Sequence, residues 1–163
     1  MHTIRIVKST MVASVGFWSV LIAFNNIVDY GSNLAFVQHV LAMDTVFPDN
    51  AVKYRAITNP LIQQIGYWGI IATEWTMAAL LLAGAWRLFA AIGDRRAFIA
   101  AKALPAVGLL LVFLLYYIGF VAIGGEWFTM WQSTIWNGQQ KAVMFLTCST
   151  LVLIVLLLPE QDE

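Results

Sequence analysis

Apolar residues gather into four long runs along the chain, separated by shorter polar stretches. Each run is long enough to cross a bilayer as a helix, which takes about 20 predominantly apolar residues. The pattern predicts transmembrane helices at about residues 9–28, 60–90, 104–124 and 141–158. We therefore expect an all-α fold, a four-transmembrane-helix bundle in which residues 1–163 form a single integral membrane domain.

Local signals set the ends of these helices. Asn59-Pro60 is typical of a helix start, because Asn caps free N–H groups and Pro at the first helical position loses no hydrogen bond. Gly124-Gly125 is expected to end the third helix, and Pro159 the fourth, before an acidic tail. The basic start could belong to a secretory signal, but Ala23-Phe-Asn-Asn26 has no small-x-small cleavage pattern. We expect an uncleaved first helix.

The longest stretch outside the runs, residues 30–58, is expected to be a short helical outer segment. Its apolar residues recur on one face of a helix at Leu34, Val37, Val40 and Leu41. Such a helix is compatible with two arrangements, one on the bilayer surface and one packed as a cap on the bundle. Pro48-Asp-Asn50 then breaks the chain and can cap a second piece at residues 51–57.

The composition agrees with a membrane protein. Of the residues, 61% are hydrophobic and only 11% are charged, whereas soluble domains carry about 25% charged residues. Nine Lys and Arg balance nine Asp and Glu, so no nucleic-acid partner is indicated. The single cysteine, Cys148, has no companion for a disulfide or a metal site, and we expect it to be a small core residue.

Lysine and arginine are distributed unevenly between the two ends of the expected bundle. Six lie near the N-terminus or the middle turn: Arg5, Lys8, Arg87, Arg95, Arg96 and Lys102. Three lie at the other end: Lys53, Arg55 and Lys141. Because loops rich in Lys and Arg stay in the cytoplasm, we expect a multi-pass protein with both the N-terminus and the C-terminus cytoplasmic.

Glu74 is the one acidic residue inside the second run. A charged carboxylate at the bilayer centre costs about 2.5–3.5 kcal/mol on insertion scales. We expect Glu74 to face the bundle interior, largely protonated because no Lys or Arg shares its depth, and to hydrogen-bond a neighbouring helix. Counting helical turns places further hydroxyl and amide groups near it: Gln63, Tyr67, Tyr116, Tyr117, Ser19 and Thr147. The set is either a ligand or proton site, or polar contacts that join the helices.

A second polar set lies where the helices end at the outer side. Its members are Asn25, Asn26, Asp29, His39, Tyr54, Arg55, Asn137 and Gln139. They form either a small pocket at headgroup depth or ordinary helix-end caps. The only histidines, His2 and His39, lie outside the runs, so no haem is expected, and no spacing of ligands predicts a metal site. No nucleophilic triad, phosphate loop or carboxylate pair indicates an enzyme.

Several motifs in the loops resemble one known family. They are Asn25-Asn-x-x-Asp-Tyr30, Phe36-Val-Gln-His-Val-Leu-Ala-Met-Asp-Thr45, Tyr54-Arg-Ala-Ile57 and Trp136-Asn-Gly-Gln139. The pattern resembles the bacterial predicted small integral membrane proteins of unknown function (domain of unknown function 2165). The resemblance covers nearly the whole chain. It implies a four-helix protein of the bacterial inner membrane, and it implies no activity or catalytic residue.

These observations favour a non-catalytic function. The preferred hypothesis is an accessory or scaffold subunit of a membrane complex, with other membrane subunits or a second copy as partners, since Trp68 and Trp75 form a stripe away from the Glu74 face. The alternative is a small transporter, or a protein that binds a quinone or another lipid-soluble ligand at Glu74. A membrane enzyme is the third and weakest hypothesis.

Overall fold

The computed structural model describes residues 2–160. Four helical spans in it are long and apolar enough to cross a membrane: His2–Val28, Pro60–Ala90, Arg95–Trp127 and Gln139–Leu157. No strand occurs among the described residues. The prediction of an all-α protein with four membrane-spanning helices is confirmed.

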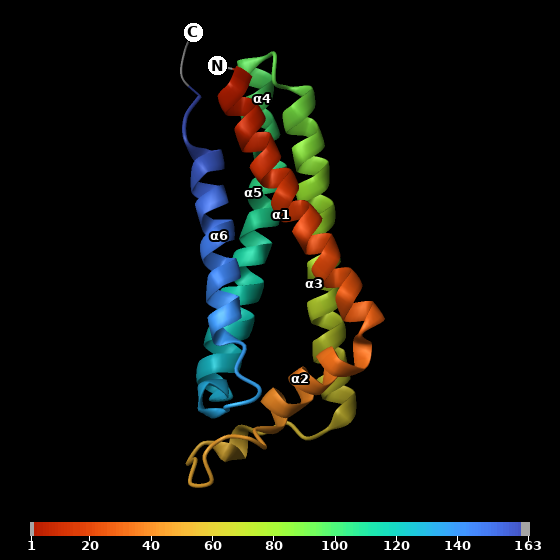
Figure 1. Cartoon of the computed structure of the whole chain (residues 1–163), viewed down its shortest axis with the longest axis vertical. Helices are drawn as coiled ribbons and strands as arrows, with labels where there is room; N and C mark the ends of the chain where they lie inside the picture. Colours follow the sequence, from red (N-terminus) through yellow and green to blue (C-terminus); the bar gives the residue numbers. More distant parts are fainter. Residues whose placement is uncertain (1, 161–163) are drawn as a thin grey trace.

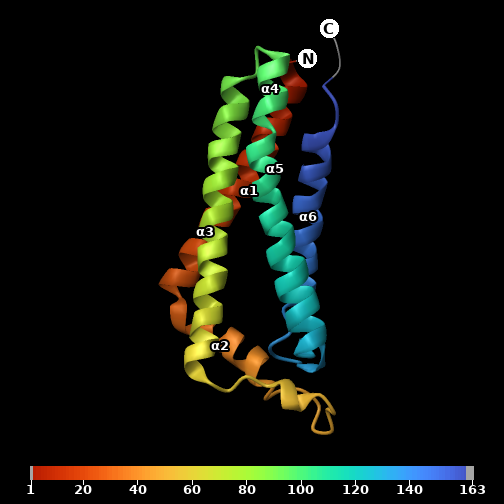
Figure 2. The same cartoon turned by 180° about the vertical axis from the view of Figure 1, so that it is seen from behind.

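The spans run side by side along the long axis of the molecule (Figures 1 and 2). Helix α1 (His2–Val28) packs along α3 (Pro60–Ala90), and α3 packs against α5 (Ala103–Phe113). The third span is composite: α4 (Arg95–Ala101) precedes α5, and the π-helix η2 (Leu114–Trp127) continues it. Helix α6 (Gln139–Leu157) packs on α5 and η2.

The start of α1 and the end of α6 lie at one end of the bundle, which we call the terminal end (Figure 1). Lys8 of α1 donates a hydrogen bond to the carbonyl of Leu158, just past α6, at 2.8 Å. The opposite end, the loop end, consists of residues 29–59 and 128–138. Helix α2 (Tyr30–Ala42) lies across it (Figure 1).

Glycines set the close approach of the helices. A Cβ at Gly84 of α3 would lie 2.6 Å from the Pro105 ring, and one at Gly108 of α5 would lie 2.9 Å from Leu81. A Cβ at Gly16 of α1 would lie 2.9 Å from Leu82. Small residues allow membrane helices to pack backbone to backbone, where dispersion contacts replace the missing hydrophobic drive.

The start of α3 follows from its capping residues. The Asn59 side-chain oxygen accepts a hydrogen bond from the N–H of Leu61 at 2.9 Å and from that of Ile62 at 3.4 Å. Pro60 occupies the first turn, where no backbone N–H is needed.

The expected end of the third span at Gly124-Gly125 is wrong. The helix continues to Trp127 with wider turns, and the N–H of Phe128 reaches the carbonyl of Ile123, five residues back, at 3.0 Å. Both glycines are buried, and a Cβ at Gly125 would overlap the side-chain amide of Gln139. The glycine pair therefore serves the close approach of α6 to η2, rather than a helix stop.

Helix α2 packs on the bundle, as one of the two arrangements compatible with its sequence requires. Val37 is buried in a cluster with Tyr67 and Ile71 of α3, and Leu34 and Leu41 cover the same cluster. The chain beyond α2 forms a single short turn at Lys53–Arg55, shorter than the expected helix at residues 51–57. Asn50 ties this loop to Gln132 at 2.7 Å.

Candidate functional site

Glu74 lies inside the bundle with 2% of its surface exposed. The side-chain amide of Asn26 in α1 donates a hydrogen bond to Glu74 Oε2 at 2.6 Å. The hydroxyl of Tyr67, two turns before Glu74 on α3, donates to the backbone carbonyl of Asn26 at 2.7 Å. These two bonds join the end of α1 to α3 and fix one oxygen of the carboxyl group.

Glu74 lines a cavity of about 360 Å³ near the loop end. Helices α1, α2, α3, η2 and α6 and the loop before α6 all contribute to its wall. Its polar or amphipathic side chains are Asn26, Asn33, Tyr67, Glu74, Tyr116, Trp136, Asn137 and Lys141. Small-molecule sites in proteins have volumes of roughly 300–1,000 Å³, so the cavity is large enough for a small ligand.

Tyr116 supplies a second polar group beside Glu74. Its side chain is buried with 4% exposure and packs against Trp18 and Phe145, at 5.9 and 5.4 Å between ring centroids. Within residues 2–160 its hydroxyl has no hydrogen-bond partner. Because Tyr116 lines the cavity, this hydroxyl is available to a ligand or to water.

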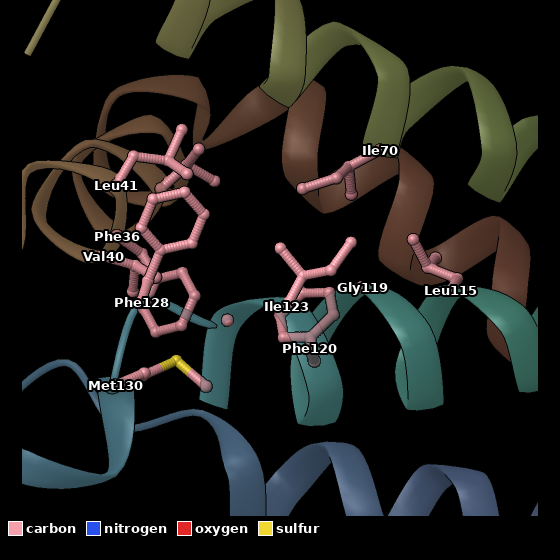
Figure 3. A pocket seen from close by; sticks show the side chains of 12 residues that line it. Phe36, Val40, Leu41, Ile70, Leu115, Gly119, Phe120, Ile123, Phe128 and Met130 are labelled. Carbon is pink, nitrogen blue, oxygen red and sulfur yellow. The ribbon is translucent and has the colours of Figure 1, made fainter. Parts of the chain in front are cut away.

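A second, apolar cavity of about 100 Å³ adjoins the first (Figure 3). Its wall holds only apolar side chains and glycines from α2, α3, η2 and the following loop, with Met130 contributing the one sulfur. The two cavities share four wall residues, Phe36, Val37, Ile70 and Phe120. The site thus combines a polar compartment at Glu74 with an apolar compartment beside it.

Lys141 places a positive charge in the wall of the Glu74 cavity, where the sequence predicted none. The sequence led us to expect no cation at the depth of Glu74, but Lys141, in the first turn of α6, lines the same cavity and is also exposed. No ion pair joins the two side chains in the described part of the chain. The cavity therefore has an acidic group on one wall and a basic group at an exposed position on another.

Four of the expected site residues make contacts elsewhere. Ser19 donates to the Val15 carbonyl of its own helix at 2.8 Å, and the exposed Thr147 donates to the Val143 carbonyl at 2.7 Å. Tyr117 is exposed and stacks on Phe113, because it follows the inward-facing Tyr116 on the helix. Gln63 donates to the Ile57 carbonyl at 2.7 Å and fixes the loop before α3. We leave these four out of the proposed site.

The outer polar set divides into separate groups. Asn26 and Asn137 reach the cavity, whereas Asn25 and Asp29 are exposed at the α1–α2 turn. His39 pairs with Asp44 at 2.7 Å and stacks on Trp136 at 4.5 Å between centroids. The three other members lie apart from the cavity wall: Tyr54, Arg55, which stacks on Trp127 at 4.2 Å, and Gln139, which packs on Gly125.

The pairing of Asn26 with Glu74 was missed from the sequence for a geometric reason. Counting turns from helix ends that are level with one another placed Ser19 of the first helix beside Glu74. Helix α1 instead ends at Val28, well inside the length of α3, and α2 begins at Tyr30. Asn26 therefore lies at the depth of Glu74. The polar residues of Asn25-Asn-x-x-Asp-Tyr30 were the available indication that the last turns of the first helix lie beside polar groups of the bundle.

Neither a metal cluster among the described residues nor a solved relative adds to the description of the site, but a family model matches the chain. Among residues 2–160, no three His, Cys, Asp or Glu side chains lie close enough together to hold a metal ion. Residues 4–159 match the family described as "Predicted small integral membrane protein (DUF2165)". No match was found among curated proteins or among solved structures.

Proposed function

This chain belongs to the family of predicted small integral membrane proteins (DUF2165), and we propose that it binds a small amphiphilic molecule inside the bilayer, with the polar group of that molecule at Glu74. In this proposal residues 1–163 form one membrane domain in a bacterial inner membrane, with both termini in the cytoplasm.

The observation that carries the proposal is the arrangement of Glu74 in its cavity. Asn26 donates to Glu74 Oε2, and within residues 2–160 no donor is bonded to Oε1, so this oxygen of a cavity-lining residue remains for a ligand. Intramembrane acids are rare and usually mark substrate, ion or proton sites. A purely structural acid would be enclosed by its partners rather than open onto a cavity of about 360 Å³.

The adjoining apolar cavity supports an amphiphile as the ligand class. A ring or tail fits the wall of aromatic and aliphatic side chains shown in Figure 3, while a hydroxyl, carbonyl or amine reaches Glu74 and Tyr116. A quinone or a lipid-like molecule has this combination of parts. The π-helix η2 contributes to both cavities, in keeping with the frequent occurrence of π-helical turns at functional sites.

The packing between Glu74 and the terminal end supports ligand binding rather than transport of a molecule through the bundle. Beyond Glu74 the core is closed by Met77, Leu81 and Leu88, each fully buried. A transporter in this state would need these side chains to separate. We therefore keep transport as the less supported form of the same hypothesis.

An accessory or scaffold role is the second candidate, supported by the outer face of α3. The side chains of Trp68, Trp75 and Trp86 are exposed, and their spacing places them on one face of this helix. Tryptophan is usually enriched at the membrane interfaces, yet Trp75 follows Glu74 directly in the middle of the span. A partner helix covering the stripe accounts for its depth.

Co-purification tests the binding function. The protein is purified in a mild nonionic detergent from membranes of its host, and molecules below about 1 kDa, of the size that pocket ligands have, are extracted and quantified by mass spectrometry. We expect one amphiphile in near-equal molar amount to the protein, and its loss in Glu74→Leu. Thr76→Val, an exposed change on the same helix, serves as the matched control and should retain it.

Two results would contradict the binding function. One is the absence of any retained small molecule from the wild-type protein. The other is equal retention by Glu74→Leu and Thr76→Val. A second protein chain that co-purifies and is lost in Trp75→Ala would support the accessory role instead.

A further inference from the structure

At the terminal end, far from the Glu74 cavity, three basic side chains pair with the carboxylate of Glu160 and a fourth contacts its backbone carbonyl. Lys8 Nζ and Lys102 Nζ each lie 2.6 Å from Glu160 Oε1, and Arg5 Nε lies 3.8 Å from Oε2. Arg95 donates to the backbone carbonyl of Glu160 at 3.0 Å. We call the four residues Arg5, Lys8, Arg95 and Lys102 the basic socket. They come from the start of α1, the start of α4 and the α4–α5 junction.

Among the described residues, the three cations Arg5, Lys8 and Lys102 carry more positive charge than the carboxylate of Glu160 neutralises. The side chains of Arg5, Lys8 and Lys102 are exposed by only 3%, 3% and 10%. Within residues 2–160, Glu160 is the one carboxylate that pairs with these three cations. Buried charges are costly unless they are paired and hydrogen-bonded. An additional or stronger anion would therefore be stabilised here.

Arg5 also has a hydrogen-bond donor without an acceptor among residues 2–160. Its Nη1 donates to the Ile92 carbonyl at 2.8 Å, but its buried Nε has no hydrogen-bond partner in the part of the chain that the structure describes. Glu160 cannot supply one in its present position, because Oε1 is shared by the two lysines and Oε2 is 3.8 Å away. A phosphate group has oxygens for Lys8, Lys102 and the guanidinium of Arg5 at once, and Arg and Lys are the usual partners of phosphate.

We propose that the basic socket is a binding site for a phosphate group and that Glu160 is its displaceable internal occupant. Glu160 follows Pro159 just beyond the last turn of α6, so it can leave without unfolding a helix. The socket lies where four spans end, the depth at which phospholipid headgroups are found, and basic pockets between spans bind anionic headgroups. The lipid phosphate and free phosphate share this chemistry, and the experiment separates them.

The test measures lipid binding to the full-length protein in a nonionic detergent by native mass spectrometry. The probes are dioleoyl phosphatidylglycerol, dioleoylglycerol as the same lipid without phosphate, and sodium phosphate. We expect the wild-type protein to bind the phosphatidylglycerol and not the dioleoylglycerol. Glu160→Gln should bind it about tenfold more tightly or better, because removing a competing occupant raises the fraction of open sites. Glu126→Gln, an exposed acid at the loop end, is the matched charge control and should behave as wild type.

A second variant covers the case in which Glu160→Gln does not fold. Arg5→Lys keeps the charge and removes the guanidinium, so it should weaken binding of phosphatidylglycerol roughly tenfold, the scale of one charge-assisted hydrogen bond. Competition by sodium phosphate against the lipid in Glu160→Gln would assign free phosphate as a ligand, and its absence would assign the lipid headgroup alone. Equal binding of phosphatidylglycerol by wild type, Glu160→Gln and Arg5→Lys would overturn the proposal and leave Glu160 as a structural ion pair.

Discussion

Asn26 and Glu74 show what one hydrogen bond does inside the bundle. The bond between Asn26 Nδ2 and Glu74 Oε2, 2.6 Å long, joins α1 to α3 and turns the carboxyl group toward the cavity. The inward direction of Glu74 was predicted from the small and polar residues on its face of the helix. The identity of its partner was not, because that depends on how far α1 extends beside α3.

Glu74→Leu should lower the free energy of unfolding by about 1 kcal/mol, the scale of interhelical hydrogen bonds in membranes. The substitution leaves the half-buried side-chain amide of Asn26 without its acceptor. Glu74→Gln keeps the shape and an acceptor oxygen and should unfold like the wild type. The measurement is reversible unfolding in mixed detergent micelles. Equal unfolding of the leucine and glutamine variants would show that the Asn26–Glu74 bond contributes nothing to stability.

Glu160 gives a prediction on pH dependence. Burial acts to raise the pKa of its carboxyl group, but hydrogen bonds from Lys102 and Lys8 outweigh it and hold the pKa below the ordinary value. A lowered pKa in the folded state means that the stabilisation is present above the unfolded value, about 4.3 for Glu, and is lost as the pH falls below it. The stability difference between wild type and Glu160→Gln should therefore be constant from pH 7 to 5 and shrink below about 4.3.

Thermal unfolding of both proteins across this pH range checks the prediction. Glu126→Gln again controls for the loss of one negative charge. A difference between wild type and Glu160→Gln that already declines between pH 7 and 5 would mean that the pKa of Glu160 is raised rather than lowered.

At the scale of the elements, the helices with strong local signals were the most predictable. The Asn59 cap and Pro60 define the start of α3 before any tertiary contact is considered. The π-helical turns of η2 left no such signal, because the apolar sequence of residues 114–123 is equally compatible with α-helix. Gly124 and Gly125 were misinterpreted for a related reason: a glycine pair indicates either a helix end or a close approach, and only the position of Gln139 decides.

Gly84→Ala should destabilise the bundle by about 1–3 kcal/mol, the usual cost of overpacking a core. Its new methyl group would overlap the ring and the backbone nitrogen of Pro105 in α5, where little can move. Gly69→Ala on the same helix is the matched control, because a Cβ there meets no atom within 4 Å. The comparison is made by thermal unfolding in one detergent. Equal stability of the two variants would exclude the close α3–α5 contact.

At the scale of the whole molecule, length and hydropathy alone predicted four spans, whereas the cavities and the basic socket needed the arrangement of the helices in space. At the basic socket, Lys8 contacts Glu160, which lies 152 positions further along the chain. The lysine and arginine bias that predicts orientation includes all four residues of the basic socket. The same side chains thus contribute to the expected topology and to the packing of the terminal end.

The orientation is a prediction that cysteine labelling can check. In a Cys148→Ser background, Asp49→Cys should react with a membrane-impermeant maleimide in intact cells, and Asp94→Cys only after lysis. Both positions are exposed, at opposite ends of the bundle. Labelling of both from one side would contradict four spans, and exchanged accessibility would reverse the orientation.

The most direct test of the central claim, a ligand at Glu74, is an experimental structure of the protein extracted with its native lipids into nanodiscs. If a small amphiphile binds at Glu74, we expect density for one such molecule. Its polar atom should lie within about 3 Å of Glu74, the range of a hydrogen bond, and its apolar part between Phe36 and Phe120. A structure in which both cavities are collapsed, or in which Glu74 is enclosed by protein groups alone, would contradict this claim.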